Sequence, residues 1–329
     1  MKERSSNTNF ARKSFIFGPV PSRRLGRSLG IDLLPCKMCS FDCVYCECGP
    51  TEHLTIEQFS EPSPDVVVSE LKKFLQTYPS DFDVITFSGS GEPTLYEPIG
   101  DLIDLLKKNF PSHPIAILTN GSLLTNHNVR KSILKADIIS PSLDAPDETL
   151  FFKINRPHPS LTWDGLIEGL VALRKEYHGN YRLEILLLKG INDSHEHLKA
   201  LADLARIINP DVVDLTTLTR PGTISALQGL SEKDLLECAN FFHNIPCSVV
   251  GNYVKKGREL PATIPDDVID ARIIELLIRR PCSLEDLADS LGVSLKTAKS
   301  ALERIKKNYI INVHRIESKL LYSLSSPLS

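Results

Sequence analysis

The sequence lacks the features that mark membrane, secreted or strongly charged proteins. Its formal net charge is only −3, which gives no overall attraction to nucleic acid or to a membrane surface. No apolar run reaches the roughly 18 residues of a membrane-spanning helix. Residues 1–14 are polar, without the apolar core of a signal peptide. We therefore expect a cytoplasmic protein with no membrane partner and a flexible tail at residues 1–14.

The eight cysteines are not spread in the manner of a disulfide framework, which indicates a reducing compartment. Three of them, Cys39, Cys43 and Cys46, are separated by three and then two residues, and Tyr45 precedes the last. One tight loop can therefore bring three thiolates together. Soft thiolates suit zinc and iron–sulfur clusters. A [4Fe–4S] cluster normally has four cysteine ligands, so three would leave one iron open to a substrate or cofactor.

Other interpretations of these cysteines remain open. Structural zinc usually takes two separated ligand pairs, whereas Cys238, Cys247 and Cys282 are scattered along the chain. A redox Cys-x-x-Cys pair would need no third cysteine. Cys36 and Cys48 flank the loop. Four roles are open for them: a fourth cluster ligand, ligands of a second metal, redox partners, or small buried residues.

Short apolar stretches alternate with helical patterns after the cysteine loop. Strands are expected at residues 28–34, 83–87, 114–118, 137–143, 181–188 and 211–218, and helices at residues 63–75, 99–110, 126–135, 160–177, 193–208 and 231–243. Residues 17–26 are rich in turn-forming residues and are expected as a loop. About six βα units predict a parallel sheet, with fewer units than the eight of a closed TIM barrel.

Polar and glycine-rich segments follow several of these strands. Functional groups gather at the carboxyl ends of the strands in parallel β/α folds. Glycines let the backbone approach a ligand closely, and hydroxyl and carboxylate side chains can bind sugar hydroxyls. The same residue types also suit plain turns and helix caps. The candidate residues are Gly89, Gly91, Glu92, Thr119, Asn120, Ser142 and Asp144 at strand ends, and Arg182 on the strand at 181–188.

The cysteine loop and the segment Gly89–Pro93 together resemble the radical S-adenosylmethionine (radical SAM) superfamily. The loop is similar to that superfamily's cluster-binding loop, including the aromatic residue before its last cysteine. Gly89–Pro93 looks like its Gly-Gly-Glu-Pro motif, with Ser90 where the first glycine is usual. Further segments at residues 18–30, 142–144, 154–159 and 188–193 resemble the wyosine-synthetase-related Fe–S oxidoreductases. The resemblance extends over roughly residues 17–222.

This resemblance implies a fold, cofactors and a reaction type. The fold would be α/β, an open (β/α)6 partial TIM barrel. Cys39, Cys43 and Cys46 would bind a [4Fe–4S] cluster, and the candidate strand-end residues would contact S-adenosylmethionine (SAM). The reduced cluster would cleave SAM to a 5′-deoxyadenosyl radical that acts on an unidentified substrate, with RNA as one candidate. A one-electron donor such as a flavodoxin or ferredoxin is implied.

A second domain is expected after the barrel at residues 15–253, because 329 residues suggest about two domains. Residues 254–267 contain Lys, Pro and Gly and are interpreted as a linker. Residues 268–329 predict three short helices and a hairpin, which resembles a winged helix-turn-helix. Lys296 and Lys299 on the third helix suit phosphates of RNA or DNA, although such modules also dimerise or bind peptides.

Two function classes compete with an enzyme. One is a cluster-sensing regulator that binds nucleic acid through the C-terminal helices. The other is a zinc-stabilised binding protein.

Overall fold

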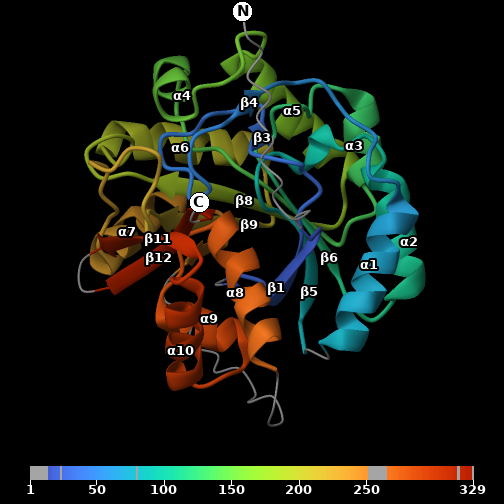
Figure 1. The fold of residues 1–329 in the computed structure, drawn as a ribbon. Coiled ribbons are helices and arrows are strands. Elements are labelled where there is room, and N and C mark those ends of the chain that lie inside the picture. Colours follow the sequence, from blue (N-terminus) through green and yellow to red (C-terminus); the bar gives the residue numbers. More distant parts are fainter. Residues whose placement is uncertain (1–13, 23, 79–80, 251–264, 317–318, 328–329) are drawn as a thin grey trace, which may run out of the picture.

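A curled sheet forms the centre of the molecule (Figure 1). The computed structural model describes residues 14–22, 24–78, 81–250, 265–316 and 319–327. In these residues the sheet has eight strands, in the order β1-β2-β5-β6-β7-β8-β9-β10. They are β1 (Ile16–Ser22), β2 (Gly26–Ile31), β5 (Val84–Phe87), β6 (Ile115–Thr119), β7 (Ile138–Pro141), β8 (Asn180–Leu187), β9 (Val212–Thr217) and β10 (Cys247–Val249). Neighbours from β2 to β10 are parallel, and β1 is antiparallel to β2.

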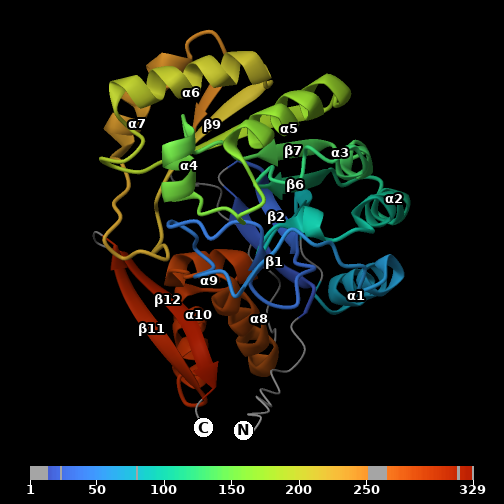
Figure 2. The same ribbon diagram turned by 90° about the horizontal axis from the view of Figure 1, so that it is seen from above.

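The six strands that the sequence predicts are present as β2 and β5 to β9, so the open (β/α)6 partial barrel is confirmed. Helices cover the outer face of the sheet in an arc (Figure 2). They are α1 (Pro64–Thr77), α2 (Ile99–Asn109), α3 (His127–Ile133), α5 (Trp163–Glu176), α6 (His195–Ile208) and α7 (Glu232–Ala239). Every residue of β5 is buried, as expected of a parallel strand that is covered on both faces.

Several elements depart from the sequence expectation. Residues 17–26 are not simply a loop, because β1 occupies most of this segment. Its two prolines are tolerated since β1 is an edge strand and many of its N–H groups need no ladder partner. Thr162 rather than Ser160 caps α5, accepting a hydrogen bond from Gly165 N. The short elements β10, α4 (Glu148–Ile154), η1 (Pro93–Leu95) and the pair β3 (Met38–Cys39) and β4 (His53–Leu54) were not predicted. The helix predicted at residues 231–243 is divided into α7 and the 3-10 helix η2 (Asn240–Phe242).

The C-terminal unit contains three helices and an antiparallel hairpin. Its elements are α8 (Asp266–Arg279), α9 (Leu284–Leu291), α10 (Leu295–Ile305), β11 (Tyr309–Ile316) and β12 (Lys319–Pro327). A capping box at Ser283 starts α9, Gly292 ends it with φ 66°, and Ser294 caps α10. These are the elements expected of a winged helix-turn-helix.

The C-terminal unit packs directly against the barrel. Its hydrophobic core includes Phe17 and Val20 of β1. Arg279 forms an ion pair with Asp32, with 2.9 Å between Nε and Oδ2, and both side chains are buried. Figure 2 shows the orange and red C-terminal elements beside the open side of the helical arc. Most of the expected tail at 1–14 and linker at 254–267 lies outside the described residues. No helix in the described part of the chain is long and apolar enough to cross a membrane.

Candidate active site

The cysteine loop lies across the carboxyl ends of the central strands. Its backbone is fixed from two sides, because Val44 N donates to Ile154 O at 2.9 Å and Glu92 N donates to Met38 O at 3.3 Å. The thiol of Cys48 donates to Gly89 O at 3.2 Å. The loop is therefore held against the segments that follow β5 and β7, at the end of the barrel where functional groups are expected.

Each of the three predicted ligands has a side-chain nitrogen beside its sulfur. The pairs are Asn120 Nδ2 with Cys39 Sγ at 3.5 Å, Asn155 Nδ2 with Cys43 Sγ at 3.6 Å, and Lys37 Nζ with Cys46 Sγ at 3.0 Å. N–H groups directed at sulfur stabilise thiolates and tune the reduction potential of a bound cluster. Sequence reasoning overlooked Lys37, although a lysine inside a cysteine-rich loop was an available signal.

The three thiols have different proton affinities. Burial raises the pKa of Cys39 to about 11, and burial also raises that of Cys43. The neighbouring Cys48 and the adjacent Lys37 ammonium lower the pKa of Cys46. Ligation requires thiolates, so binding of an iron cluster would displace protons from Cys39 and Cys43.

The donor set fits a [4Fe–4S] cluster. Among the described residues, no three His, Cys, Asp or Glu side chains converge on a point that one metal ion could occupy. A [4Fe–4S] cluster requires a different arrangement, because each cysteine binds a separate iron atom. Cys39, Cys43 and Cys46 supply three soft donors from one loop, and each has an N–H donor close to its sulfur.

The glycine-rich turn after β5 packs tightly on the cysteine loop. A Cβ atom added to Gly91 would lie 1.6 Å from Met38 O, so only glycine fits there. Gly89 has φ +137°, a backbone conformation that would be strained in a residue with a side chain. Ser90, which replaces the usual glycine of the motif, binds the carboxylate of Asp32 through its N at 3.2 Å and its Oγ at 2.8 Å.

Glu92, Thr119 and Asn120 come together at the ends of β5 and β6. The Glu92 carboxylate is buried and accepts hydrogen bonds from Thr119 Oγ1 and Asn120 N, both at 2.7 Å, and from Thr94. Burial raises the pKa of Glu92. These side chains therefore join two strand ends, and the Glu92 carboxylate is occupied by the protein itself.

Asp144 forms a second buried junction. It accepts hydrogen bonds from the Tyr45 hydroxyl, from Asn155 Nδ2 at 3.1 Å and from Leu186 N at 3.0 Å. Burial raises the pKa of Asp144 to about 6. This junction ties the cysteine loop to the ends of β7 and β8.

Ser142 and Arg182 occupy different levels of the barrel. Ser142 directly follows β7, and its N donates to Thr119 O at 3.0 Å, which places it among the strand-end candidates. Arg182 lies near the amino end of β8, where it binds Asp214 with distances of 2.8 and 2.7 Å. The structure thus does not bring Arg182 to the cysteine loop.

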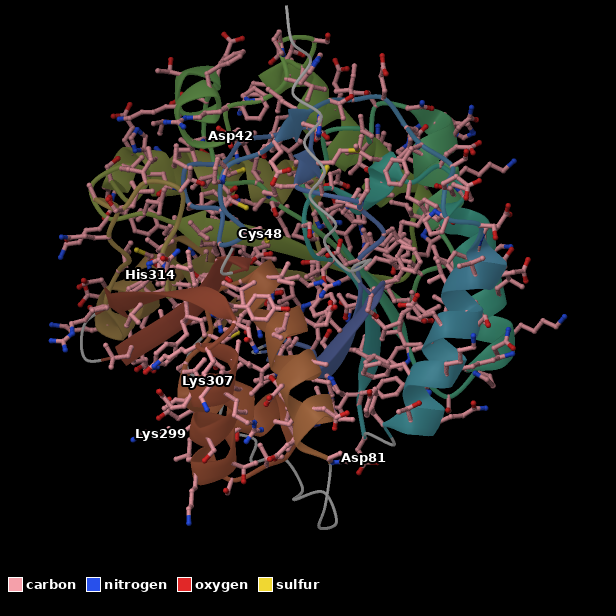
Figure 3. The ribbon with its side chains drawn as sticks, in the orientation of Figure 1. Asp42, Cys48, Asp81, Lys299, Lys307 and His314 are labelled. Carbon is pink, nitrogen blue, oxygen red and sulfur yellow. The ribbon has the colours of Figure 1, made fainter. Side chains whose placement is uncertain are left out.

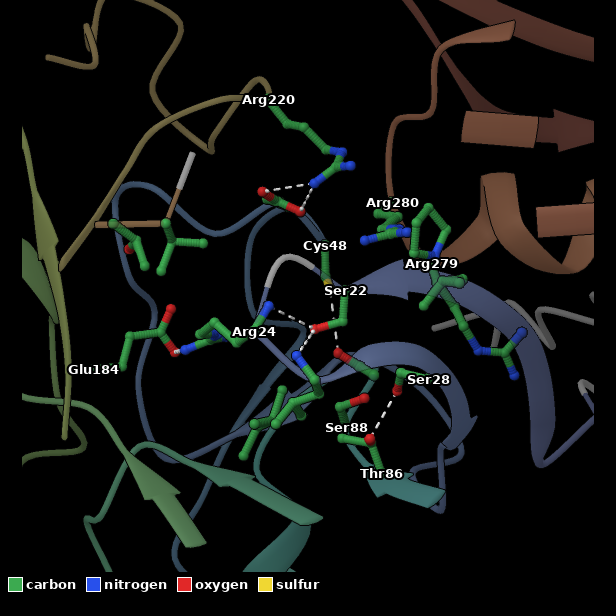
Figure 4. Close-up of a pocket in the computed structure, with 18 of the residues that line it drawn as sticks. Ser22, Arg24, Ser28, Cys48, Thr86, Ser88, Glu184, Arg220, Arg279 and Arg280 are labelled. Atoms are coloured by element: carbon green, nitrogen blue, oxygen red, sulfur yellow. Dashed lines mark hydrogen bonds and ion pairs between the residues drawn. The ribbon is translucent and has the colours of Figure 1, made fainter. Parts of the chain in front are cut away.

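A chamber of about 360 Å³ opens beside the cysteine loop (Figure 4). Its walls are β1 and the following turn, the loop from Tyr45 to Cys48, parts of strands β2, β5, β6, β8 and β9, the turn after β5, and residues Arg279, Arg280 and Asp286 of the C-terminal unit. Gly89 is the one candidate SAM-contact residue in these walls. The C-terminal arginines were not identified from the sequence, because the helix that carries them was assigned to a separate domain.

The candidate nucleic-acid residues Lys296 and Lys299 are exposed on α10. Figure 3 shows Lys299 and Lys307 at one end of the molecule, well separated from Cys48. They are not part of the chamber.

Residues 33–204, more than half of the chain, match the model of the Radical SAM superfamily. The protein belongs to this superfamily. It is therefore a radical SAM enzyme whose cofactors are a [4Fe–4S] cluster and SAM, and it needs an electron donor. Membership selects the enzyme over a zinc-stabilised binding protein.

Two curated relatives align with most of this radical SAM enzyme. "GTPase Obg" of Brachyspira hyodysenteriae is 34% identical over 94% of this chain, but the chain spans only 45% of that protein. A "UPF0026 protein" of Helicobacter pylori strain J99 is 36% identical, over 82% of this chain and 86% of its own length.

Solved structures share the fold at low sequence identity. A radical SAM methyltransferase from Sphaerobacter thermophilus has a TM-score of 0.52 and 20% identity, covering 68% of this chain and 65% of its own. The structure of TYW1 with a lysine-pyruvate adduct bound has a TM-score of 0.51 and 18% identity, covering 70% and 76%. At these identities the likeness concerns the fold alone.

Proposed function

We propose that this enzyme reductively cleaves SAM at a [4Fe–4S] cluster bound by Cys39, Cys43 and Cys46, and directs the resulting radical at a substrate in the chamber. The observation that carries the proposal is that Cys46 and Gly89 share a wall of this chamber. A cofactor between the cysteine loop and the glycine turn would therefore face bound substrate. When bound, the cluster and SAM supply the electron transfer and bond cleavage that side chains cannot perform.

The protein's own residues position these groups. Lys37, Asn120 and Asn155 direct N–H groups at the three sulfurs. The side chains of Glu92 and Asp144 are engaged within the protein, so they would orient the turns around SAM, and the backbone of residues 89–91 would contact it. The C-terminal unit covers one side of the chamber and restricts access of water to it.

The subfamily and the macromolecular partner are narrower proposals. The motifs at residues 18–30 and 154–159 support the wyosine-synthetase-related group, and the fold likeness to TYW1 is compatible with it. RNA or DNA as a partner is supported by the exposed Lys296 and Lys299 on α10. A flavodoxin or ferredoxin is proposed as the electron donor.

Anaerobic reconstitution tests the proposal directly. The full chain should bind one [4Fe–4S] cluster and, after chemical reduction, release 5′-deoxyadenosine from SAM, as measured by chromatography. Cys39→Ala, Cys43→Ala and Cys46→Ala should each abolish cluster binding. The matched control is Cys238→Ala, a buried free cysteine distant from the loop. A protein that holds the cluster and SAM but releases no 5′-deoxyadenosine with any strong reductant contradicts the proposal.

The flanking cysteines can be assigned in the same experiment. One cluster per chain requires that Cys36→Ala and Cys48→Ala leave the iron content near that of the unchanged protein. A loss of one whole cluster equivalent in either variant would show that a second metal site exists.

A further inference from the structure

More arginines than acidic side chains line the chamber. Four arginines and three acidic residues line it: Arg24, Arg220, Arg279, Arg280, Glu47, Glu184 and Asp286. Three of the arginines are ion-paired, Arg24 with Glu184 at 2.6 Å, Arg220 with Glu47 and Asp286 at 3.3 Å each, and Arg279 with Asp32 at 2.9 Å. In the part of the chain that the structure describes, Arg280 forms no such pair.

Arg280 presents an unoccupied pair of hydrogen-bond donors. Its Nε and Nη2 atoms are buried, yet neither has a hydrogen-bond partner among the described residues. A guanidinium whose buried N–H groups have no protein acceptor is costly, and an oxygen that accepts from these groups would offset that cost. Figure 4 shows Arg280 in the pocket wall, near Cys48.

Other arginines of this chain show what the Nε–Nη2 edge binds. Arg130 holds Glu176 with Nε and Nη2 at 3.0 and 2.7 Å, Arg182 holds Asp214 at 2.8 and 2.7 Å, and Arg304 holds Asp270 at 2.9 and 2.7 Å. In each case two parallel N–H groups match the two oxygens of a carboxylate. Arg280 offers the same edge with no carboxylate hydrogen-bonded to it among the described residues, and the nearby Asp286, whose pKa it helps to lower, is paired with Arg220.

Two neighbouring walls supply additional unpaired polar atoms. Arg220 Nε and Thr216 Oγ1 are buried without a hydrogen-bond partner in the described residues, and both residues line the chamber. Figure 4 shows Arg220 and Arg280 around the same part of the pocket. Thr216 on β9, Arg220 after β9 and Arg280 at the end of α8 thus line one chamber.

We propose that the guanidinium of Arg280, supported by Arg220 and Thr216, binds a carboxylate or phosphate group of the substrate. This inference rests on the proposed function and narrows its substrate to a molecule that bears an oxyanion. With the anion at Arg280, the remainder of the substrate lies in the chamber beside Cys46 and Gly89. The C-terminal unit then contributes directly to substrate binding.

The test measures anion binding by the reconstituted full chain without reduction or turnover. Inorganic phosphate and malonate are titrated separately at constant ionic strength, and the concentration-dependent rise in melting temperature gives an apparent Kd. Arg280→Gln should weaken binding of the preferred anion about 10- to 100-fold, because two charge-assisted hydrogen bonds are removed. Arg280→Lys should weaken anion binding less, since the positive charge remains but the two parallel N–H groups of the guanidinium are lost. Arg206→Gln, an exposed arginine on α6, is the matched control.

The preferred probe distinguishes a phosphate-bearing substrate from a carboxylate-bearing one. Thr216→Val removes an unpaired hydroxyl without a charge change, and it should also weaken binding, which keeps the test decisive if Arg280→Gln fails to fold. Equal anion affinity in all variants, or no binding of either probe to the unchanged protein, overturns the proposal. SAM affinity, measured by equilibrium dialysis, should be unchanged in Arg280→Lys. A parallel loss there would assign Arg280 to the SAM carboxylate instead. Release of 5′-deoxyadenosine by the unchanged protein tests the proposed function separately.

Discussion

The buried ion pair between Arg279 and Asp32 should dominate the stability of the junction between the barrel and the C-terminal unit. The two side chains are 2% and 1% exposed, and Asp32 also binds Ser90 of the glycine turn. Replacing one partner of such a pair leaves a buried charge without its counterion, which costs about 3–5 kcal/mol. Arg279→Met should therefore lower the free energy of unfolding by about that amount.

Urea unfolding of a double-mutant cycle measures the interaction itself. Asp32→Asn is the second single variant, and the double variant should be less destabilised than the sum of the two, with a coupling of about 1–3 kcal/mol. Lys135→Met is the control, because its ion pair with Asp104 is 64% and 48% exposed and is worth about 0–1 kcal/mol. A coupling below about 0.5 kcal/mol between Arg279 and Asp32 would refute the reasoning.

Three further predictions concern the turn, the buried carboxyl and the C-terminal helix. Gly91→Ala should displace the cysteine loop, because its Cβ would lie 1.6 Å from Met38 O, and iron content after reconstitution should fall well below that of the unchanged protein. Because burial raises the pKa of Asp144 to about 6, the folded state binds this proton more tightly than the unfolded chain, so stability should fall as pH rises from about 4 to above 6. Asp144→Asn should remove this part of the pH dependence, as measured by urea unfolding at both ends of the range. If RNA or DNA binds α10, replacing Lys296 and Lys299 with Ala should make the binding constant less dependent on salt. The slope of log binding constant against log salt concentration should fall by about 0.9 for each phosphate that is no longer neutralised. Gel shifts with bulk tRNA and duplex DNA at two salt concentrations measure this slope.

The fold was predictable wherever local pattern and packing agree. Each βα unit combines a short apolar strand with an amphipathic helix, so its period is visible in any short window of sequence. The strand β1 was missed because Pro19 and Pro21 argue for a loop when neighbours are unknown. Its position at the edge of the sheet, beside β2, makes the prolines acceptable. That position is a tertiary fact, which no local window contains.

In the candidate site, too, some residues could be recognised from the local sequence and others could not. Cys39, Cys43 and Cys46 could be recognised because their donors come from one loop with a diagnostic spacing. The residues that surround them come from distant segments. Asn155 lies 112 positions from Cys43, and Arg279 lies 247 positions from Asp32. Only the folded chain brings such groups together, so the spacing of residues in the sequence could not reveal these contacts.

Two consecutive arginines at the end of α8 show how burial separates a structural charge from one available to a ligand. Arg279 and Arg280 are identical in chemistry, and both line the chamber. Arg279 finds Asp32, Glu275 and the carbonyl of Ser14, so its donors are occupied within the protein. Arg280 keeps two buried N–H groups without a described partner. A protein gains no stability from such a group on its own, since desolvation without a hydrogen bond is unfavourable. In the binding mode that we propose, an oxyanion in the chamber would accept hydrogen bonds from Arg280, and the same step would place a substrate beside the cysteine loop.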